Sequence, residues 1–177
     1  LKKHHARIAR IQVSHTQMKT VVLQTGIEPS KVFQIPIAVN LDFFPLRDGK
    51  SKVDARKQLG IPQSTFVIGS FQKDGVGWGD GNKPKLIKGP DVFLATIKKL
   101  KAHIPELYVL LSGPARGYIK AGLEALQVPY QHSYLDDYSV IGRMYQALDL
   151  YLVTSRQEGG PKAILESMAS GVPLIST

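Results

Sequence analysis

Short apolar runs alternate along this chain with longer segments in which apolar residues recur every three or four positions. The runs Phe66–Phe71, Leu107–Ser112 and Leu150–Val153 predict buried strands. The segment from Pro90 to about Ala102 places its apolar residues on one face and predicts an amphipathic helix. Strands that alternate with helices of roughly 10–13 residues predict an α/β fold with a doubly wound parallel sheet.

Residues that start and stop helices predict further elements. Ser14, with Gln17 three positions later, predicts the cap of a helix over 16–24. Ser51 predicts the cap of a helix that ends at Gly60. Shorter strands are expected at 9–13, 32–37, 130–132 and 172–175, and further helices at 118–126, 137–147 and 161–170.

An irregular apolar stretch at 38–50 predicts a junction between two domains. The chain starts at Leu1 rather than at a methionine, and its last expected strand stops abruptly at Thr177, so we expect a piece of a longer protein. In parallel α/β sheets, ligands bind at the carboxyl ends of the strands. The loops expected to line a site are 70–90, 112–117, 132–137 and 154–161.

Composition narrows the classes of function. The chain has no cysteine, which excludes a disulfide framework, a thiolate metal site and a cysteine nucleophile, and is typical of a reducing compartment. No apolar run approaches the length of about 18 residues that a membrane span needs. The formal net charge of +9 indicates an anionic partner, such as a phosphate, a nucleic acid or an anionic membrane face, although solubility alone is an alternative reason for it.

The loop 154–161 carries the strongest candidate chemistry. Gly159 and Gly160 lead into a helix whose first N–H groups lack partners, and such a helix start attracts anions and oxygen ligands. Glu158 stands at this helix mouth, and Glu166 lies eight positions later, inside the helix. Two carboxylates in this arrangement can accept hydrogen bonds from the hydroxyls of a sugar and a ribose.

Each of these residues also has an ordinary structural explanation. Lys162 and Glu166 have the i,i+4 spacing of a surface ion pair. Glu158 is equally a first-turn acid that the helix dipole favours. A turn alone is an alternative reason for the two glycines.

The basic loop 72–90 is the second candidate. Lys88 stands at a helix start, where a cation opposes the helix dipole, so a bound phosphate would compensate it. The other lysines of the loop are expected to lie on a solvated, mobile segment. Trp78 would either stack on a base or sugar or hold the loop down. The histidines have no ligand spacing, and no metal site is expected.

Two blocks near the end of the chain, 158–161 and 166–173, resemble the E-x7-E motif region of retaining GT-B glycosyltransferases of family 4. The resemblance extends over essentially the whole chain. Four further stretches match blocks of the same family in the same order: 34–44, 66–71 with 88–89, 110–113 and 145–150.

The resemblance implies that residues 51–177 form the nucleotide-sugar-binding, Rossmann-like half of a GT-B fold, incomplete at its C-terminus. Residues 1–37 would be the end of the N-terminal acceptor domain, and 38–50 the interdomain linker. The implied activity is transfer of a sugar from a nucleotide-diphosphate donor to a sugar, lipid or glycan acceptor, with retention of anomeric configuration and without a metal or other cofactor. The piece by itself is expected to bind donor weakly and to transfer nothing.

The resemblance also implies roles for single residues. Lys88 would neutralise the donor diphosphate and Glu158 would contact the transferred sugar, both as catalytic residues. Gly159 and Gly160 would hold sugar or phosphate through their amides. Glu166 would bind the ribose hydroxyls.

The remaining donor contacts are implied less directly. The backbone near Tyr134 and Leu135 would lie beside the base. The family often has Gly-Arg after the first strand of this domain, whereas Gly69 is followed by Ser70 here. Lys73 is therefore the expected source of a second cation.

Two other functions stay open on the sequence. One is a basic module that binds a nucleotide, a nucleic acid or an anionic membrane without transferring a sugar. The other is a GT-B sugar-nucleotide epimerase, which the context of the two glutamates disfavours. The expected partners are a nucleotide sugar and its acceptor, with an anionic membrane surface as a further candidate and no specific nucleic acid. The expected location is the cytoplasm, including its membrane periphery.

Overall fold

The computed structural model describes residues 1–177 and divides into two compact units. The first comprises residues 1–39 together with 158–162, and the second comprises residues 40–157 and 163–177. None of the helices combines the length and the apolar character that a membrane crossing demands.

The first unit is built around a single β-α-β arrangement. Strand β1 (Ile11–Val13) pairs in parallel with β2 (Val32–Gln34), and α1 (Thr16–Leu23) connects them together with the 3₁₀ helix η2 (Pro29–Lys31). A further 3₁₀ helix, η1 (His5–Arg7), precedes β1. The core of this unit consists of four buried aliphatic residues: Val13, Val22, Ile27 and Val32.

The cap of α1 differs from the prediction. His15, not Ser14, is the N-cap, and its Nδ1 atom accepts a hydrogen bond from the backbone N–H of Met18 at 3.3 Å. An imidazole nitrogen can satisfy an unpaired N–H of the first turn as a hydroxyl does. The helix ends at its C-cap Gln24, and Gly26 follows in the left-handed conformation that often terminates helices.

The second unit contains a five-stranded sheet in which every neighbouring pair is parallel. The strand order is β5-β4-β3-β6-β7, so the chain moves outward from β3 in one direction and then returns to continue in the other. The strands are β3 (Phe66–Phe71), β4 (Leu107–Ser112), β5 (Tyr130–Ser133), β6 (Leu150–Val153) and β7 (Leu174–Ser176).

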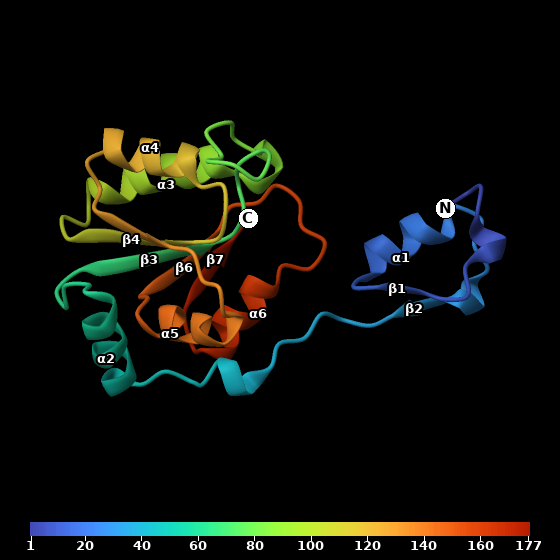
Figure 1. Ribbon diagram of the computed structural model, residues 1–177, viewed down its shortest axis with the longest axis horizontal. Helices are drawn as coiled ribbons and strands as arrows, with labels where there is room; N and C mark the ends of the chain where they lie inside the picture. Colours follow the sequence, from blue (N-terminus) through green and yellow to red (C-terminus); the bar gives the residue numbers. More distant parts are fainter. The chain divides into compact units, whose positions relative to one another are not determined.

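Helices cover both faces of this sheet, as Figure 1 shows, with α3 and α4 on one face and α2, α5 and α6 on the other. This arrangement confirms the predicted α/β fold with a parallel sheet wound in both directions. The helices are α2 (Gly49–Leu59), α3 (Pro90–Lys101), α4 (Gly117–Ala125), α5 (Ile141–Gln146) and α6 (Lys162–Ala169), with 3₁₀ helices η3 (Leu41–Phe43), η4 (Leu86–Lys88) and η5 (Tyr138–Val140).

Two helix starts in this unit correct the prediction. Asp48, not Ser51, is the N-cap of α2. Each side chain accepts a hydrogen bond from the backbone N–H of the other residue: Ser51 N–H donates to Asp48 Oδ1 at 2.7 Å, and Asp48 N–H donates to Ser51 Oγ at 2.9 Å. The single helix expected at 137–147 is a 3₁₀ turn followed by the short α5. Asp137 caps that turn by accepting from Ser139 N–H at 2.8 Å.

The apolar core lies between the sheet and the helices α3 and α4. Phe93 and Ile97 of α3 and Ile119 of α4 are completely buried against Ile68 and Val109 of the sheet. Fully burying one such side chain contributes about 1.5–3 kcal/mol, so this layer fixes the strands whose carboxyl ends carry the loops described next.

Candidate functional site

The strand order reverses between β3 and β6, and the loops that follow these two strands are fastened to each other. Gly89, the N-cap of α3, has a φ of 62°, and a Cβ atom at this position would lie 1.7 Å from the carbonyl oxygen of Thr154. Thr154 Oγ1 in turn donates to the carbonyl of Gly89 at 2.9 Å. Ligands of open α/β sheets bind at such a switch point.

Lys88 is held at this junction by its backbone. Its N–H donates to Lys85 O at 2.8 Å, and its carbonyl accepts from Gln72 Nε2 at 3.3 Å. One residue earlier, the carbonyl of Ile87 accepts from the N–H of Arg156, 2.9 Å away in the β6 loop. The structure thus brings the predicted cation Lys88 to the loop that precedes the two glutamates.

A side-chain ion pair reinforces the same junction. Arg156 contacts Asp91 through two parallel hydrogen bonds, Nη1–Oδ1 at 2.8 Å and Nη2–Oδ2 at 2.6 Å. The hydrogen bond with Arg156 holds the pKa of Asp91 below its ordinary value. Both side chains are exposed, so we regard the pair as fixing geometry more than adding stability.

Glu166 lies on the inward face of α6 and is only 4% exposed. Its Oε1 atom accepts a hydrogen bond from the hydroxyl of Tyr138, and its Oε2 atom accepts one from the hydroxyl of Tyr145 at 2.8 Å. The residue is therefore not part of a surface ion pair, which was the structural alternative for it. A buried carboxylate with two phenol donors is a positioned acceptor of hydrogen bonds.

The two tyrosines are embedded in a cluster of aromatic rings. Tyr145 packs against Phe44, Phe71 and Tyr151, with ring centroids 5.8, 4.8 and 5.3 Å away. Tyr138 lies edge-on to Phe44 at 5.8 Å. Burial raises the pKa of both tyrosines, with Glu166 adding to the effect, so both phenols stay protonated and able to donate. Through Phe44, the segment expected to link two domains supports the groups that hold Glu166.

The glycine-rich loop after β3 contains a hairpin, on which Lys83 and Lys85 are exposed as expected. Gly75 bridges to Pro84, and Val76 N–H donates to Lys83 O at 2.9 Å, which makes a hairpin. The carbonyls of Asp80 and Gly81 accept from the first N–H groups of α4. The hairpin therefore also caps a helix.

The base of this hairpin rests on a buried ion pair that sequence reasoning missed. Arg116 Nη2 lies 3.3 Å from Asp74 Oδ2, and both side chains are almost completely buried. Arg116 also donates to Ser70 Oγ at 3.0 Å and to the carbonyls of Gln72 and Ser112. Burial raises the pKa of Asp74, and Arg116 partly offsets the increase. The only available signal was a lone arginine in the loop after a predicted strand.

Lys73 and Trp78 lie together on the exposed side of the hairpin. Lys73 Nζ is 3.5 Å from the centroid of the Trp78 ring, a cation–π contact, and Trp78 is 83% exposed. The predicted second cation is thus held by an aromatic ring of its own loop.

The remaining predicted residues are distributed as follows. Glu158, Gly159 and Gly160 belong to the first unit, in which the Gly159 carbonyl accepts a hydrogen bond from Ser14 Oγ at 2.6 Å. Tyr134 and Leu135 follow β5 at the carboxyl end of an edge strand, and Tyr134 is exposed. No group of three or more histidine, aspartate or glutamate side chains is arranged to hold a metal ion.

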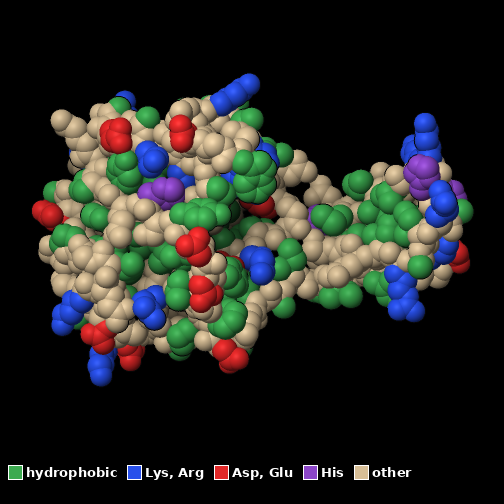
Figure 2. Space-filling model, viewed as in Figure 1, with side chains coloured by type: hydrophobic (Ala, Val, Ile, Leu, Met, Phe, Trp, Pro, Cys, Tyr) green, Lys and Arg blue, Asp and Glu red, His purple; other side chains and the backbone are tan.

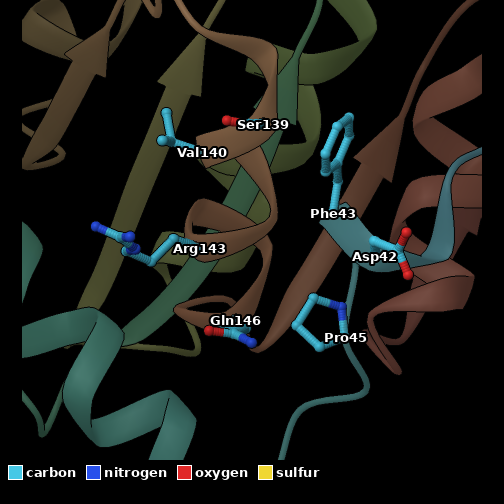
Figure 3. A pocket seen from close by; sticks show the side chains of 7 residues that line it. All are labelled: Asp42, Phe43, Pro45, Ser139, Val140, Arg143 and Gln146. Atoms are coloured by element: carbon cyan, nitrogen blue, oxygen red, sulfur yellow. The ribbon is translucent and has the colours of Figure 1, made fainter.

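A hollow of about 180 Å³ lies elsewhere on the second unit. Its walls come from two segments, the η3 region and the η5–α5 segment, as Figure 3 shows. None of the predicted site residues lines this hollow. The lining residues are Asp42, Phe43, Pro45, Ser139, Val140, Arg143 and Gln146.

Comparison with known proteins shows the family to which the chain belongs. A family model described as glycosyl transferases group 1 matches residues 84–177, which is just over half of the chain. The chain belongs to this family. The match contains the α3 junction, the buried Glu166 and the whole β6 loop.

Individual relatives agree with the family assignment. The chain is 27% identical to the lipopolysaccharide core biosynthesis mannosyltransferase LpsB of Rhizobium meliloti, over 71% of this chain and 35% of that protein. It is also 27% identical to a D-inositol 3-phosphate glycosyltransferase of Segniliparus rotundus, over 93% of this chain and 36% of the relative. The chain thus spans about a third of the length of the curated relatives it matches.

The fold is that of solved glycosyltransferases. The crystal structure of HepE from Anabaena in complex with UDP-glucose superposes with a TM-score of 0.73 at 18% identity, covering 95% of this chain and 44% of that one. The five-stranded parallel sheet of this chain matches the C-terminal Rossmann-like domain of GT-B enzymes.

Proposed function

We propose that this chain supplies the donor-binding part of a glycosyltransferase that uses a nucleotide-diphosphate sugar and retains the anomeric configuration. The observation that carries the proposal is the contact between Gly89 and Thr154, which fixes Lys88 beside the β6 loop where the strand order reverses. A fixed cation at that point can stabilise the charge that develops on a leaving diphosphate. The HepE structure with UDP-glucose supports a nucleotide sugar as the class of donor.

The proposed roles assign one or more residues to each part of a nucleotide sugar: the diphosphate, the ribose and the transferred sugar. Lys88 neutralises the diphosphate, and Glu166 accepts hydrogen bonds from the ribose. Glu158 contacts the transferred sugar, and the amides of Gly159 and Gly160 help to hold it or the phosphate. These roles use a positioned charge and positioned acceptors, so the proposal needs no metal ion.

Two further donor contacts complete the proposal. The backbone at Tyr134 and Leu135, after the edge strand β5, lies beside the base. Lys73 provides the second cation, for which it leaves the ring of Trp78. Ser70 stands where the family often has arginine, and the buried charge of Arg116 next to it is already balanced by Asp74.

The proposed division of the chain assigns residues 1–37 to the end of an acceptor domain, 38–50 to the linker and 51–177 to the donor domain. The chain by itself would then bind the nucleotide and transfer no sugar, because a sugar, lipid or glycan acceptor is held elsewhere in the whole enzyme. Sugar transfer by the 177-residue chain would contradict this assignment.

A peripheral contact with an anionic membrane is a second proposal, and the hairpin after β3 favours it. Val76 and Trp78 are exposed at this hairpin, close in the chain to the exposed Lys83 and Lys85. Exposed tryptophan flanked by lysine suits the interface between lipid headgroups and acyl chains. The location that we propose is the cytoplasm, including its membrane periphery.

A nucleic-acid binder is less well supported. Figure 2 shows basic side chains dispersed among acidic ones over the viewed face of the larger unit, without the continuous basic track that a phosphate backbone follows. For a GT-B epimerase, the other alternative, neither relative compared above offers support, since both are named as transferases.

Titration of the 177-residue chain with UDP, GDP, ADP and a random oligonucleotide, each at two salt concentrations, tests the proposal. We expect one nucleotide to bind more tightly than the other two, and its affinity to be the same in the presence of EDTA. We expect the affinity for the oligonucleotide to fall steeply as the salt concentration rises. Glu166→Gln is expected to weaken the preferred nucleotide about tenfold. Glu124→Gln is the matched control, because Glu124 also accepts a tyrosine hydroxyl, at 2.7 Å from Tyr130. Equal binding of all three nucleotides, or no effect of Glu166→Gln, would contradict the proposal.

A further inference from the structure

The two phenols that bond to Glu166 differ in how firmly they are held. Tyr145 is completely buried on α5, wedged among Phe44, Phe71 and Tyr151. Tyr138 is 40% exposed and lies on the three-residue helix η5. The hydroxyl bonded to Oε2 therefore belongs to a fully buried side chain, whereas the hydroxyl bonded to Oε1 belongs to a partly exposed one.

The fixed phenol also has a backbone neighbour on the helix of the glutamate. The hydroxyl of Tyr145 lies 3.4 Å from the carbonyl of Ala163, one turn before Glu166 on α6. Movement of Tyr145 would disturb the aromatic cluster and the helix together. Movement of Tyr138 would disturb its edge contacts with Phe43 and Phe44.

We infer that Tyr138 is a displaceable cover on Glu166, whose hydroxyl a ribose hydroxyl replaces when the donor binds, and that Tyr145 is the fixed positioning residue. This inference rests on the proposed function, because it assigns a ribose to Glu166. The number of hydrogen bonds that Glu166 accepts stays the same, because one O–H donor leaves Oε1 and another takes its place.

The burial of Glu166 explains why its carboxylate needs a hydrogen-bond donor that can move away. A carboxylate that is 4% exposed cannot accept bonds from a ligand until something over it moves. In the absence of ligand, an uncovered buried carboxylate oxygen would be left without a donor, which is costly. Tyr138 supplies that donor. Because η5 begins three residues after Leu135, a base beside the β5 loop would act on the segment that carries the cover.

The cover lowers the affinity for ribonucleotides, and this is the measurable consequence. A ligand that binds only the uncovered form has its affinity reduced by the fraction of molecules that are uncovered. Tyr138→Phe removes the competing hydroxyl while keeping the ring against Phe43 and Phe44. Tyr145→Phe removes the fixed donor and leaves the carboxylate less well positioned.

The test is calorimetric titration of the 177-residue chain with UDP, GDP and ADP and with their 2′-deoxy counterparts. For the preferred nucleotide, Tyr138→Phe is expected to tighten the ribose form about 5- to 10-fold and the deoxy form less, which raises the ratio of the two affinities. Tyr145→Phe is expected to lower that ratio. Tyr130→Phe, which removes the phenol that donates to Glu124, is the matched control and should leave it unchanged.

The outcomes separate the inference from the proposed function. If the wild-type chain prefers ribose over deoxyribose and Glu166→Gln abolishes the preference, but Tyr138→Phe does not raise it, the inference is wrong and the proposed function stands. If no nucleotide binds, or ribose and deoxyribose forms bind alike to the wild-type chain, both are wrong. Equal melting temperatures of Tyr138→Phe and wild type exclude misfolding as the cause of either result.

Discussion

The carbonyl oxygen of Thr154 occupies the space that a Cβ atom at Gly89 would need, 1.7 Å from the ideal Cβ position. The two residues belong to loops that follow β3 and β6, at the reversal of strand order. Because the contact is between backbone atoms, neither loop can retreat without moving a strand or the start of α3. The position of Lys88, one residue earlier, is set by this contact.

Gly89→Ala is expected to separate the two loops. The substitution combines a left-handed backbone, with φ of 62°, and a clash with backbone, which together cost about 2–4 kcal/mol of unfolding free energy. The affinity for the preferred nucleotide should fall about tenfold or more, as titration would measure. Gly79→Ala in the same loop is the control, since nothing lies within 4 Å of its Cβ position and its φ is not positive. An equal effect of both substitutions would contradict the account.

Removing Arg116 should leave a buried, uncompensated carboxylate at Asp74. Arg116→Met is expected to lower the unfolding free energy by about 3 kcal/mol in urea denaturation. The double variant Asp74→Leu with Arg116→Met should recover part of this loss, because neither buried charge remains. A loss of unfolding free energy in the double variant that exceeds the sum of the losses in the two single variants would contradict this role. The ion pair would then not be the support of the hairpin.

Asp149 makes the second unit sensitive to acid. Burial raises the pKa of this carboxyl, but hydrogen bonds from Lys52, from the N–H of Val67 and from Arg56 outweigh burial and hold the pKa below its ordinary value. As pH falls, the unfolded chain therefore takes up the proton first. The stabilisation is complete at neutral pH and is lost progressively below about pH 4.

The corresponding variant is Asp149→Asn. It should cost about 3 kcal/mol at pH 7, because the buried Arg56 loses its carboxylate partner. Urea denaturation of both proteins between pH 3 and 7 should show the difference shrinking as the pH falls. A difference independent of pH would exclude Asp149 as its source.

Binding to anionic vesicles should depend on Trp78. Trp78→Ala is expected to weaken co-sedimentation with vesicles of mixed phosphatidylcholine and phosphatidylserine about tenfold. Leu46→Ala is the control, because Leu46 is also strongly exposed but lies outside the hairpin. Binding that survives Trp78→Ala, or that is equal on purely zwitterionic vesicles, would remove the hairpin as a membrane contact.

The sequence predicted the strands of the sheet more closely than the helix starts. The ranges of β3, β4 and β6 match their apolar runs, because a buried parallel strand is a continuous apolar segment. The caps at His15 and Asp48 were missed, because several polar residues near a helix start can each accept the same N–H.

In the candidate site, too, some residues could be predicted from the sequence and others could not. Lys88 and Glu166 could be selected from local context, since one lies at a helix start and the other within a helix after a glycine pair. The partners of Glu166 could not, because Tyr138 and Tyr145 reach it across 28 and 21 residues of chain. Their seven-residue spacing was the only local signal. The pairing of Asp74 with Arg116 likewise depends on how a hairpin folds onto a neighbouring loop.

The central claim is that Lys88 meets the diphosphate of a nucleotide bound at this junction. The most direct measurement is the difference in binding free energy between a nucleoside diphosphate and its nucleoside, for UDP, GDP and ADP, in the wild-type chain and in Lys88→Met. The account predicts that Lys88→Met removes most of this difference for the preferred nucleotide, while Lys85→Met, in the same loop, leaves it nearly intact. An unchanged difference in Lys88→Met, or an equal loss in both variants, would contradict the claim.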